Sequence, residues 1–258
     1  VDDAINLSAR KRLFFQMGLS VSALAPIVYG VSGSLSLTSG LLFLFILLLV
    51  LAEINFYNFA DGINGHVALQ SLATLVCWSL YFRENSNIYS LSLDPVMLTL
   101  IGSILVFLFA NMIKKWVFMG DTGSTFLGFL IVLFPLYQLQ KLGQTPDKLL
   151  MHIWASLVFS AIIWLDCLAI ILMKMLNHIA LFKPHRHHFY QQLSRRPGWG
   201  HSRASLTLSL WQLAIGGSFI LGECLNQFWY LVFGLLIALY LVVIGFFTAK
   251  ARTFIAAL

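Results

Sequence analysis

The chain has 258 residues, of which 59% are hydrophobic and only 10% are charged, whereas an ordinary soluble domain has about 25% charged residues. This composition excludes a soluble globular protein, because a water-exposed surface needs more polar side chains. The net charge of +6 requires no nucleic-acid partner, since the basic residues gather in a few loops that suit anionic lipid headgroups and phosphates.

Hydrophobic runs of about 17 to 25 residues recur along the chain, and each is long enough to cross a bilayer as a helix. The period-two alternation of strands is missing. We therefore predict an all-α, polytopic membrane helix bundle that forms one integral-membrane domain over residues 1–258. The eight expected spans are approximately 17–33, 38–56, 66–82, 95–113, 124–140, 151–173, 205–222 and 227–248.

Basic residues gather in alternate loops, which predicts the orientation because cytoplasmic loops collect Lys and Arg. Of the 16 basic residues, thirteen lie in one set of loops and the C-terminal segment, and three lie in the other set. This bias places the following segments in the cytoplasm: 1–16, 56–66, 113–123, 174–204 and the C-terminus. The chain opens on Val1 and on a polar stretch that fits no signal peptide, so we expect an N-terminal part of the native chain to be absent.

The first polar group of the predicted cytoplasmic face is the adjacent pair Asp2 and Asp3. Neighbouring carboxylates at a membrane surface can bind a divalent cation, or one of them can act as a base towards a phosphate. The alternative is a solvated, charged loop start.

The second polar group follows the second expected span and contains Asn55, Asn58, Asp61 and Gly62. A helical spacing of three would put the two amides and the carboxylate on one face, where they would form the wall of a polar pocket. The glycines predict a tight turn in which a ligand can meet the backbone. A plain helix end followed by a turn explains the glycines but not the polar face.

The third group is Gly120-Asp121-Thr122-Gly123-Ser124, just before the fifth expected span. An aspartate between glycines and hydroxyls at a helix N-terminus suits a Mg²⁺-diphosphate site, because the backbone approaches closely and the helix dipole favours anions. The alternative is that Asp121 caps the helix.

The fourth group is the basic segment with His185, Arg186 and His188, and His201 lies farther along the same loop. Histidine and arginine side chains bind oxyanions through charge-assisted hydrogen bonds. A transition-metal site is the alternative, although it lacks cysteine partners. Asp166 stands inside the sixth expected span, where an acid is costly unless it is paired, so we expect it to face the bundle interior and to have a structural partner. A direct catalytic role is the alternative for this residue.

Together, and in this order, these segments resemble the polyprenyl-phosphate N-acetylhexosamine-1-phosphate transferases of glycosyltransferase family 4. That family includes the enzymes that initiate O-antigen and enterobacterial common antigen, and the phospho-MurNAc-pentapeptide translocase. The matching segments are Asp2-Asp3 with Leu7-Ser8 and Arg12, Asn55-x-x-Asn58-x-x-Asp61-Gly62, Gly120-Asp121-x-Gly123-Ser124 and His185-Arg186-x-His188.

Within the family, the residues after the histidine segment resemble the O-antigen initiating branch. Phe189-Tyr190-Gln191 stands where the pentapeptide translocase usually has Phe-Glu after three histidines. Eight helices after the Asp2-Asp3 pair also fit the eleven-helix branch, so the resemblance implies about three helices before residue 1.

The resemblance implies transfer of HexNAc 1-phosphate from UDP-HexNAc to undecaprenyl phosphate, which releases UMP and initiates O-antigen or another cell-surface polysaccharide. It implies a bacterial inner-membrane enzyme with a cytoplasmic active site and Mg²⁺, or alternatively Mn²⁺, as its cofactor. The implied catalytic residues are Asp2, Asp3 and Asp121, the implied metal ligands are Asp121 and Asp61, and the implied substrate contacts are Asn55, Asn58, Asp61, Gly62, His185, Arg186, His188 and His201.

A transporter or flippase of an anionic lipid-linked sugar is the alternative function. Transport predicts ionisable residues at mid-membrane on several helices, and we identify only Asp166 and Glu223 as candidates. The clustering of acids at one surface favours surface chemistry. The sugar stays open among GlcNAc, GalNAc, N-acetylfucosamine and N-acetylquinovosamine. The oligomeric state is open too, and related membrane enzymes are often homodimers.

Overall fold

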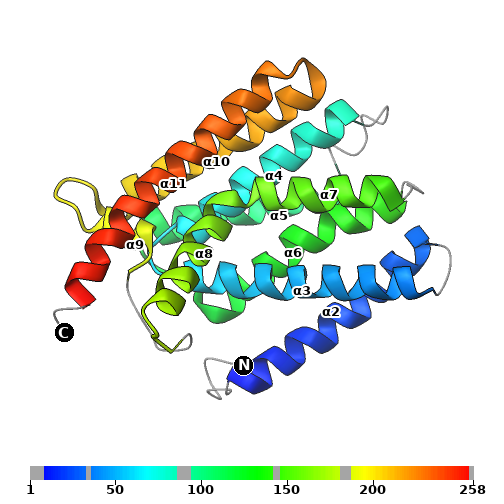
Figure 1. Ribbon diagram of the computed structural model, residues 1–258, viewed down its shortest axis with the longest axis horizontal. Coiled ribbons are helices and arrows are strands. Elements are labelled where there is room, and N and C mark those ends of the chain that lie inside the picture. The colour runs from blue at the N-terminus through cyan, green and yellow to red at the C-terminus, as the bar shows by residue number, and fades with distance from the viewer. Residues whose placement is uncertain (1–8, 33–35, 86–93, 142–145, 181–186, 256–258) are drawn as a thin grey trace. The chain divides into compact units, whose positions relative to one another are not determined.

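The computed structural model describes residues 9–32, 36–85, 94–141, 146–180 and 187–255 (Figure 1). Regular structure in these residues is helical throughout, without a strand, which confirms the predicted all-α class. The helices are α2 (Ala9–Ser32), α3 (Leu37–Ala60), α4 (His66–Asn85), α5 (Pro95–Leu108), the π-helix η1 (Phe109–Ile113), α6 (Gly120–Lys141), α7 (Pro146–Phe159), α8 (Ala161–Leu176), α9 (Phe189–Ser194), α10 (Gly200–Cys224) and α11 (Phe228–Ile255).

Six helical segments in the described part of the chain are long and apolar enough to cross a membrane. They are Arg10–Val31, Leu37–Ala60, Pro95–Ile113, Gly120–Gln138, Gly200–Cys224 and Phe228–Phe247. The bent pair Lys148–Phe159 and Ala161–Leu176 makes a seventh if it forms one span. The expected span at 66–82 is also helical, as α4, but does not reach the same apolar character. The chain is a multi-pass membrane protein.

The expected continuous helix at 151–173 is wrong, because the structure breaks it at Ser160 between α7 and α8. The side chain of Gln212 on α10 compensates for this break. Its Nε2 donates to the carbonyl of Val158 at 2.9 Å, and its Oε1 accepts from the N–H of Ile162 at 2.9 Å. A membrane helix tolerates such a break where a neighbouring helix satisfies the freed backbone groups. The break was not predictable from the apolar pattern of residues 151–173, because it depends on Gln212 of another helix.

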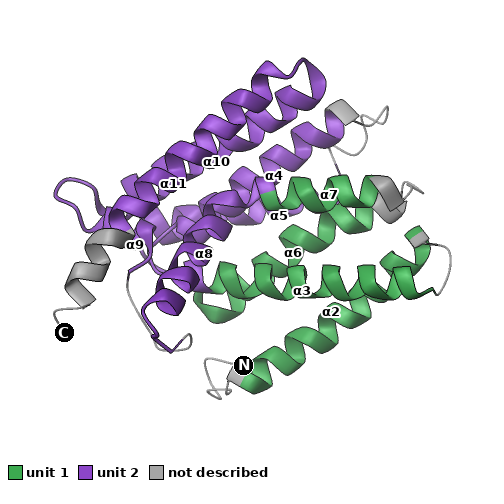
Figure 2. Ribbon diagram, in the orientation of Figure 1, with its two compact units in different colours: residues 1–58, 119–157 green, residues 59–118, 158–258 purple. Residues whose placement is uncertain are grey.

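The chain forms two compact units (Figure 2). Unit 1 consists of Val1–Asn58 and Met119–Leu157, and unit 2 consists of Phe59–Phe118 and Val158–Leu258. This division does not test our assignment of residues 1–258 to a single domain, which therefore stays a prediction.

Unit 1 buries an aliphatic core between α2, α3, α6 and α7. Its fully packed members are Leu24, Ile27, Val28, Ile46, Leu47, Val50, Ile54, Val132, Leu136, Leu149 and Ile153. Gly128 lets α6 approach α3 closely, because a Cβ atom there would lie 2.9 Å from the Cβ of Tyr57 and 3.0 Å from the Cα of Ile54. Small residues serve this purpose between membrane helices, where close backbone approach replaces the hydrophobic effect.

Unit 2 is organised around α10, which packs against α4, α11 and the short α9. Figure 1 shows α10 and α11 running side by side. An aromatic core supports this arrangement: the ring of Trp78 stacks on Phe82 and meets Phe159 edge-on, each with 5.1 Å between centroids. The packing fixes α9, which follows directly after the predicted phosphate-binding segment.

Candidate active site

In unit 1, an arginine near the start of α2 pairs with an aspartate in the first turn of α6. Arg12 Nη1 donates a hydrogen bond to Asp121 Oδ2, and the two groups form an ion pair. The Arg12 side chain is 37% exposed and the Asp121 side chain 46%, so a ligand can reach both. A guanidinium and a carboxylate at one accessible point can bind a phosphate and a divalent cation side by side.

The Arg12–Asp121 pair lines a pocket of about 500 Å³ within unit 1. Gln16, Thr122 and Thr125 add polar groups to its wall. The apolar part of the wall consists of Phe15, Leu19, Ile54, Phe126 and Phe129. A site with charged groups and a long apolar wall fits an amphiphile such as a lipid phosphate.

The start of α6 is built so that Asp121 lies within the first helical turn. Gly120 adopts a left-handed backbone with a φ of 65°, which glycine tolerates without strain. Ser124 Oγ donates to the carbonyl of Gly120 at 3.0 Å, and Asn58 Nδ2 donates to the same Oγ at 3.2 Å. Asp121 therefore follows the first residue of α6 and pairs with Arg12, which does not favour the N-cap alternative.

The predicted polar face of Asn55, Asn58 and Asp61 is only partly correct. Asn55 and Asn58 lie on α3, but α3 ends at Ala60, so Asp61 begins the turn instead of extending the helical face. Asn55 Nδ2 donates to Gln16 Oε1 at 3.1 Å, and Asn58 contacts α6 as described above. The two amides thus connect α3 to α2 and α6, and their contact with a substrate stays a prediction.

Glu53 is an acidic residue that sequence reasoning missed. It lies inside the apolar helix α3, and only 3% of it is exposed. Our count of mid-membrane acids, which named Asp166 and Glu223, is therefore incomplete. The signal was available in the sequence, because a single glutamate follows a run of leucines.

In unit 2, the turn after α3 contacts α9. The hydroxyl of Tyr190 donates to the carbonyl of Phe59 at 3.0 Å, and Gln191 Nε2 donates to that hydroxyl at 3.2 Å. Gly62 lies so close to Tyr190 and Gln191 that a Cβ atom would overlap both side chains. The predicted Asp61–Gly62 turn and the residues after the histidine segment therefore form one contact.

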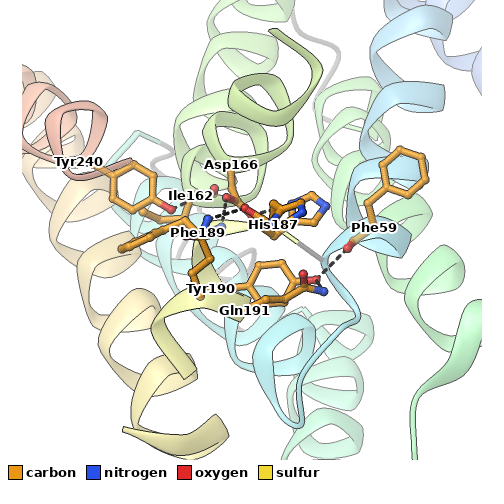
Figure 3. A network of polar contacts seen from close by, with 10 residues as sticks. Phe59, Ile162, Asp166, His187, Phe189, Tyr190, Gln191 and Tyr240 are labelled. Carbon is orange, nitrogen blue, oxygen red and sulfur yellow. Dashed lines mark hydrogen bonds and ion pairs between the residues drawn. The ribbon is translucent and has the colours of Figure 1, made fainter. Parts of the chain in front are cut away.

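Asp166 of α8 lies in the same unit and contacts the start of α9 (Figure 3). Its Oδ2 lies 2.9 Å from His188 Nδ1, and its Oδ1 accepts the backbone N–H of Phe189 at 2.8 Å. Each of the Asp166 and His188 side chains is only 6% exposed. This confirms that Asp166 faces the interior and has a partner, and it places His188 in a buried position.

The ring of Tyr190 stacks on two histidine rings. Its centroid lies 4.5 Å from that of His66 and 5.4 Å from that of His188. Burial, reinforced by the negative charge of Asp166, raises the pKa of Tyr190 well above its ordinary value. Tyr190 therefore keeps its proton and remains the donor to the carbonyl of Phe59.

His201 at the start of α10 contacts the same turn. Its Nδ1 accepts the backbone N–H of Asn64 at 3.4 Å, and Ser205 Oγ donates to the carbonyl of Asn64 at 3.1 Å. Unit 2 thus brings together the turn after α3, His188 and His201, and their sharing of one substrate site stays a prediction.

Several predicted site residues are not described by the structure. Asp2, Asp3, His185 and Arg186 lie outside the described residues. Asp61 belongs to unit 2 and Asp121 to unit 1, so their joint metal site stays a prediction.

Comparison with known proteins identifies the family. Residues 1–139 match glycosyl transferase family 4. The chain is 30% identical over 139 residues to a probable undecaprenyl-phosphate N-acetylglucosaminyl 1-phosphate transferase of Bacillus subtilis. This alignment covers 54% of this chain and 37% of the relative.

Two further relatives match more of the chain. A phospho-N-acetylmuramoyl-pentapeptide-transferase of Fervidobacterium nodosum is 30% identical over 220 residues, covering 82% of this chain and 64% of the relative. An undecaprenyl-phosphate α-N-acetylglucosaminyl 1-phosphate transferase of Yersinia pestis is 24% identical over 237 residues, covering 88% and 62%. The chain thus spans less than two thirds of the length of these relatives. With a family match over more than half of its residues, the chain belongs to glycosyl transferase family 4.

Proposed function

We propose that this protein transfers HexNAc 1-phosphate from a UDP-HexNAc donor to undecaprenyl phosphate and releases UMP. Family membership supports the proposal, and so do relatives named as transferases of this kind. Those names do not favour the transporter alternative. The excess of basic residues in alternate loops supports an active site on the cytoplasmic face. The bacterial relatives support an inner membrane as its location.

The pocket at the Arg12–Asp121 pair is the observation that carries this proposal. A polyprenyl phosphate has one charged end and a long apolar tail, and the pocket offers the matching surfaces within a single unit. Arg12 binds the lipid phosphate, while Phe15, Leu19 and Phe126 contact the first part of its tail.

The family implies Mg²⁺, and the residues present fit this ion. The Asp121 carboxylate is nearly half exposed, and the hydroxyls of Thr122 and Thr125 line the same pocket. Mg²⁺ prefers such oxygen ligands and usually binds through one or two carboxylates together with substrate phosphates. Asp121 would hold the ion with Asp61 as a second ligand, and Mn²⁺ would suit the same donors. The bound ion would offset the charge of the diphosphate.

In the net reaction, a bond forms between an oxygen of the lipid phosphate and the β-phosphorus of the donor. The bond between that phosphorus and the oxygen bridging to the α-phosphate breaks, and UMP departs with this oxygen. Asp2 or Asp3 positions or deprotonates the lipid phosphate. The donor contacts we propose are Asn55, Asn58, Asp61 and Gly62 for the nucleotide sugar, and His185, Arg186, His188 and His201 for its phosphates.

The test is release of UMP by detergent-purified full-length protein supplied with undecaprenyl phosphate and a panel of UDP-HexNAc donors, with Mg²⁺ or EDTA. Release that needs both the lipid and Mg²⁺ would support the proposal, and the panel would identify the sugar. No release with any donor, from protein shown to be folded, would overturn it. We also propose that this transfer initiates O-antigen or another cell-surface polysaccharide, and the donor preference and the product would test that role. Sedimentation of the same sample would test for a homodimer.

Asp121→Asn is the informative variant in this assay. Loss of a carboxylate that holds the metal removes several kcal/mol of charge stabilisation, so turnover should fall by about 100-fold or more. Glu223→Gln is the matched control, because this exposed carboxylate accepts a hydrogen bond from the Tyr230 hydroxyl and belongs to no site of the proposed transferase. Equal turnover in the Asp121 and Glu223 variants would remove Asp121 from the mechanism.

A further inference from the structure

We propose that Asp166 is a positioning residue that fixes the tautomer and orientation of His188. The proposal rests on the function proposed above, in which His188 contacts a substrate phosphate. Its basis is one buried carboxylate with two separate partners: Oδ2 lies 2.9 Å from His188 Nδ1, and Oδ1 accepts the N–H of Phe189 at 2.8 Å. Figure 3 shows Asp166 directed at the start of α9.

The chemistry of the pair fixes where the imidazole carries its proton. A carboxylate can only accept hydrogen bonds, so the nitrogen that faces it, Nδ1, must be the donor. The other nitrogen, Nε2, is then the one at which a proton can be gained or lost. A carboxylate behind a functional histidine sets the tautomer and the ring plane in the same way at many protein sites.

The second contact of Asp166 fixes the backbone that carries this ring. The N-terminus of α9 receives no capping hydrogen bond from the His188 side chain, and Asp166 accepts the N–H of Phe189 instead. The His188 and Asp166 side chains are each 6% exposed, so water competes little for these bonds. One carboxylate thus fixes both the ring of His188 and the backbone that follows it.

Tyr190 supplies an independent anchor for the same segment. Its hydroxyl donates to the carbonyl of Phe59, and its ring stacks on His188 with centroids 5.4 Å apart. Gly62 leaves room for this contact, since a Cβ atom there would overlap Tyr190. His188 is therefore held in a defined position beside the turn that carries Asp61 and Gly62, which is what a role in positioning requires.

Asp166→Asn separates positioning from simple packing. The amide keeps the size of the side chain and keeps an oxygen to accept the N–H of Phe189. Its NH₂ group would face His188 Nδ1, which must then become an acceptor, so the proton moves to Nε2. The variant therefore preserves the cap of α9 and reverses the tautomer of His188.

Two measurements follow from this reversal. Two-bond ¹H–¹⁵N correlation spectra of ¹⁵N-histidine-labelled protein in detergent, with His188 assigned by its loss in His188→Gln, should show Nδ1–H in the parent protein and Nε2–H in Asp166→Asn. The kcat for UMP release should fall by about 10- to 100-fold, the size of the loss when a carboxylate that orients a metal-binding histidine is removed. The KM for the donor should change much less.

Asp94→Asn is the matched control, because Asp94 is another buried aspartate that caps a helix in unit 2. Its Oδ1 accepts the N–H of Val96 at the start of α5 at 2.8 Å. This variant should keep both the parent kcat and the parent spectrum of His188.

The spectra and the turnover assay test the proposal separately, and either one can contradict it without the other. Turnover of Asp166→Asn within twofold of the parent would overturn the proposal, and so would a parent His188 that carries its proton on Nε2. The parent spectrum decides the tautomer even if Asp166→Asn does not fold. Absence of UMP release from the parent protein would contradict the proposed function but not the pairing of Asp166 with His188. The spectra would still test that pairing.

Discussion

Asn58 Nδ2 donates a hydrogen bond to Ser124 Oγ over 3.2 Å, which joins the last turn of α3 to the beginning of α6. Ser124 is fully buried and donates in turn to the carbonyl of Gly120. This hydroxyl therefore connects α3 to the residue that precedes Asp121. The position of the Asp121 carboxylate depends on a side chain that stands 63 positions earlier in the sequence.

A double-mutant cycle tests this connection. Asn58→Ala and Ser124→Ala should each destabilise the protein, and the double variant should lose less than the sum of the two. Hydrogen bonds between membrane helices have coupling energies of about 0.6 kcal/mol on average and up to about 1.7 kcal/mol. Unfolding of the four proteins in mixed detergent would give the coupling energy, and strict additivity would show that the bond contributes nothing.

Gly62→Ala should destabilise the protein through overlap with the side chains of α9. The new methyl group would meet the hydroxyl of Tyr190 and the amide of Gln191, and the buried tyrosine ring has little room to move. Overpacking of this kind typically costs about 1 to 3 kcal/mol. The thermal midpoint of the purified protein should fall accordingly.

Two comparisons make the Gly62 experiment specific. Gly217→Ala on α10 is the control, because no heavy atom lies within 4 Å of its added methyl group, and this variant should be no less stable than the parent. Because Tyr190→Phe removes the overlapping hydroxyl, Gly62→Ala should cost less stability in a Tyr190→Phe background than in the parent. If both glycine variants melt alike, the close contact between Gly62 and Tyr190 is not tight in solution.

The features predictable from sequence are those that depend on local patterns. Lengths of apolar runs located six of the eight expected spans in the described part of the chain, and the high cost of an acid inside a membrane correctly predicted that Asp166 has a partner. The break at Ser160 was not predictable in this way. It depends on Gln212, a residue of a different helix whose role is visible only once the chain is folded.

The candidate site shows the same contrast between features that local patterns predict and features that depend on contacts between distant residues. The motif segments containing Asp121 and His188 stood out because their polar residues interrupt an apolar chain. In the sequence, Arg12 stands out only as part of a matching segment, and Tyr190 only as a feature of the branch. Their roles arise from pairing with Asp121 and from contact with Phe59, across 109 and 131 residues of sequence. No local spacing encodes contacts of that range.

His187 should make the protein less stable in acid. Burial, together with the positive charge of Arg195, lowers the pKa of His187 below its ordinary value of 6.5. The unfolded chain then binds a proton more readily than the folded chain, so stability is intact above about pH 6.5 and falls as the pH decreases below it. Thermal midpoints at about pH 7.5 and about pH 5.5 should differ less in His187→Gln than in the parent.

The control for this pH effect is His178→Asn. His178 is exposed and has a φ of 54°, which asparagine tolerates. Its variant should keep the pH dependence of the parent. An unchanged pH dependence in His187→Gln would show that other groups cause the loss of stability in acid.

Gln212→Leu should destabilise unit 2 at the break between α7 and α8. The substitution keeps an apolar side chain of similar size but removes the partners of the Val158 carbonyl and the Ile162 N–H. Each buried backbone group left without a partner costs about 1 to 3 kcal/mol, so thermal unfolding should begin at a clearly lower temperature. Gln227→Leu at an exposed position is the control and should change little. A Gln212 variant as stable as this control would mean that water or a rearranged backbone satisfies the break.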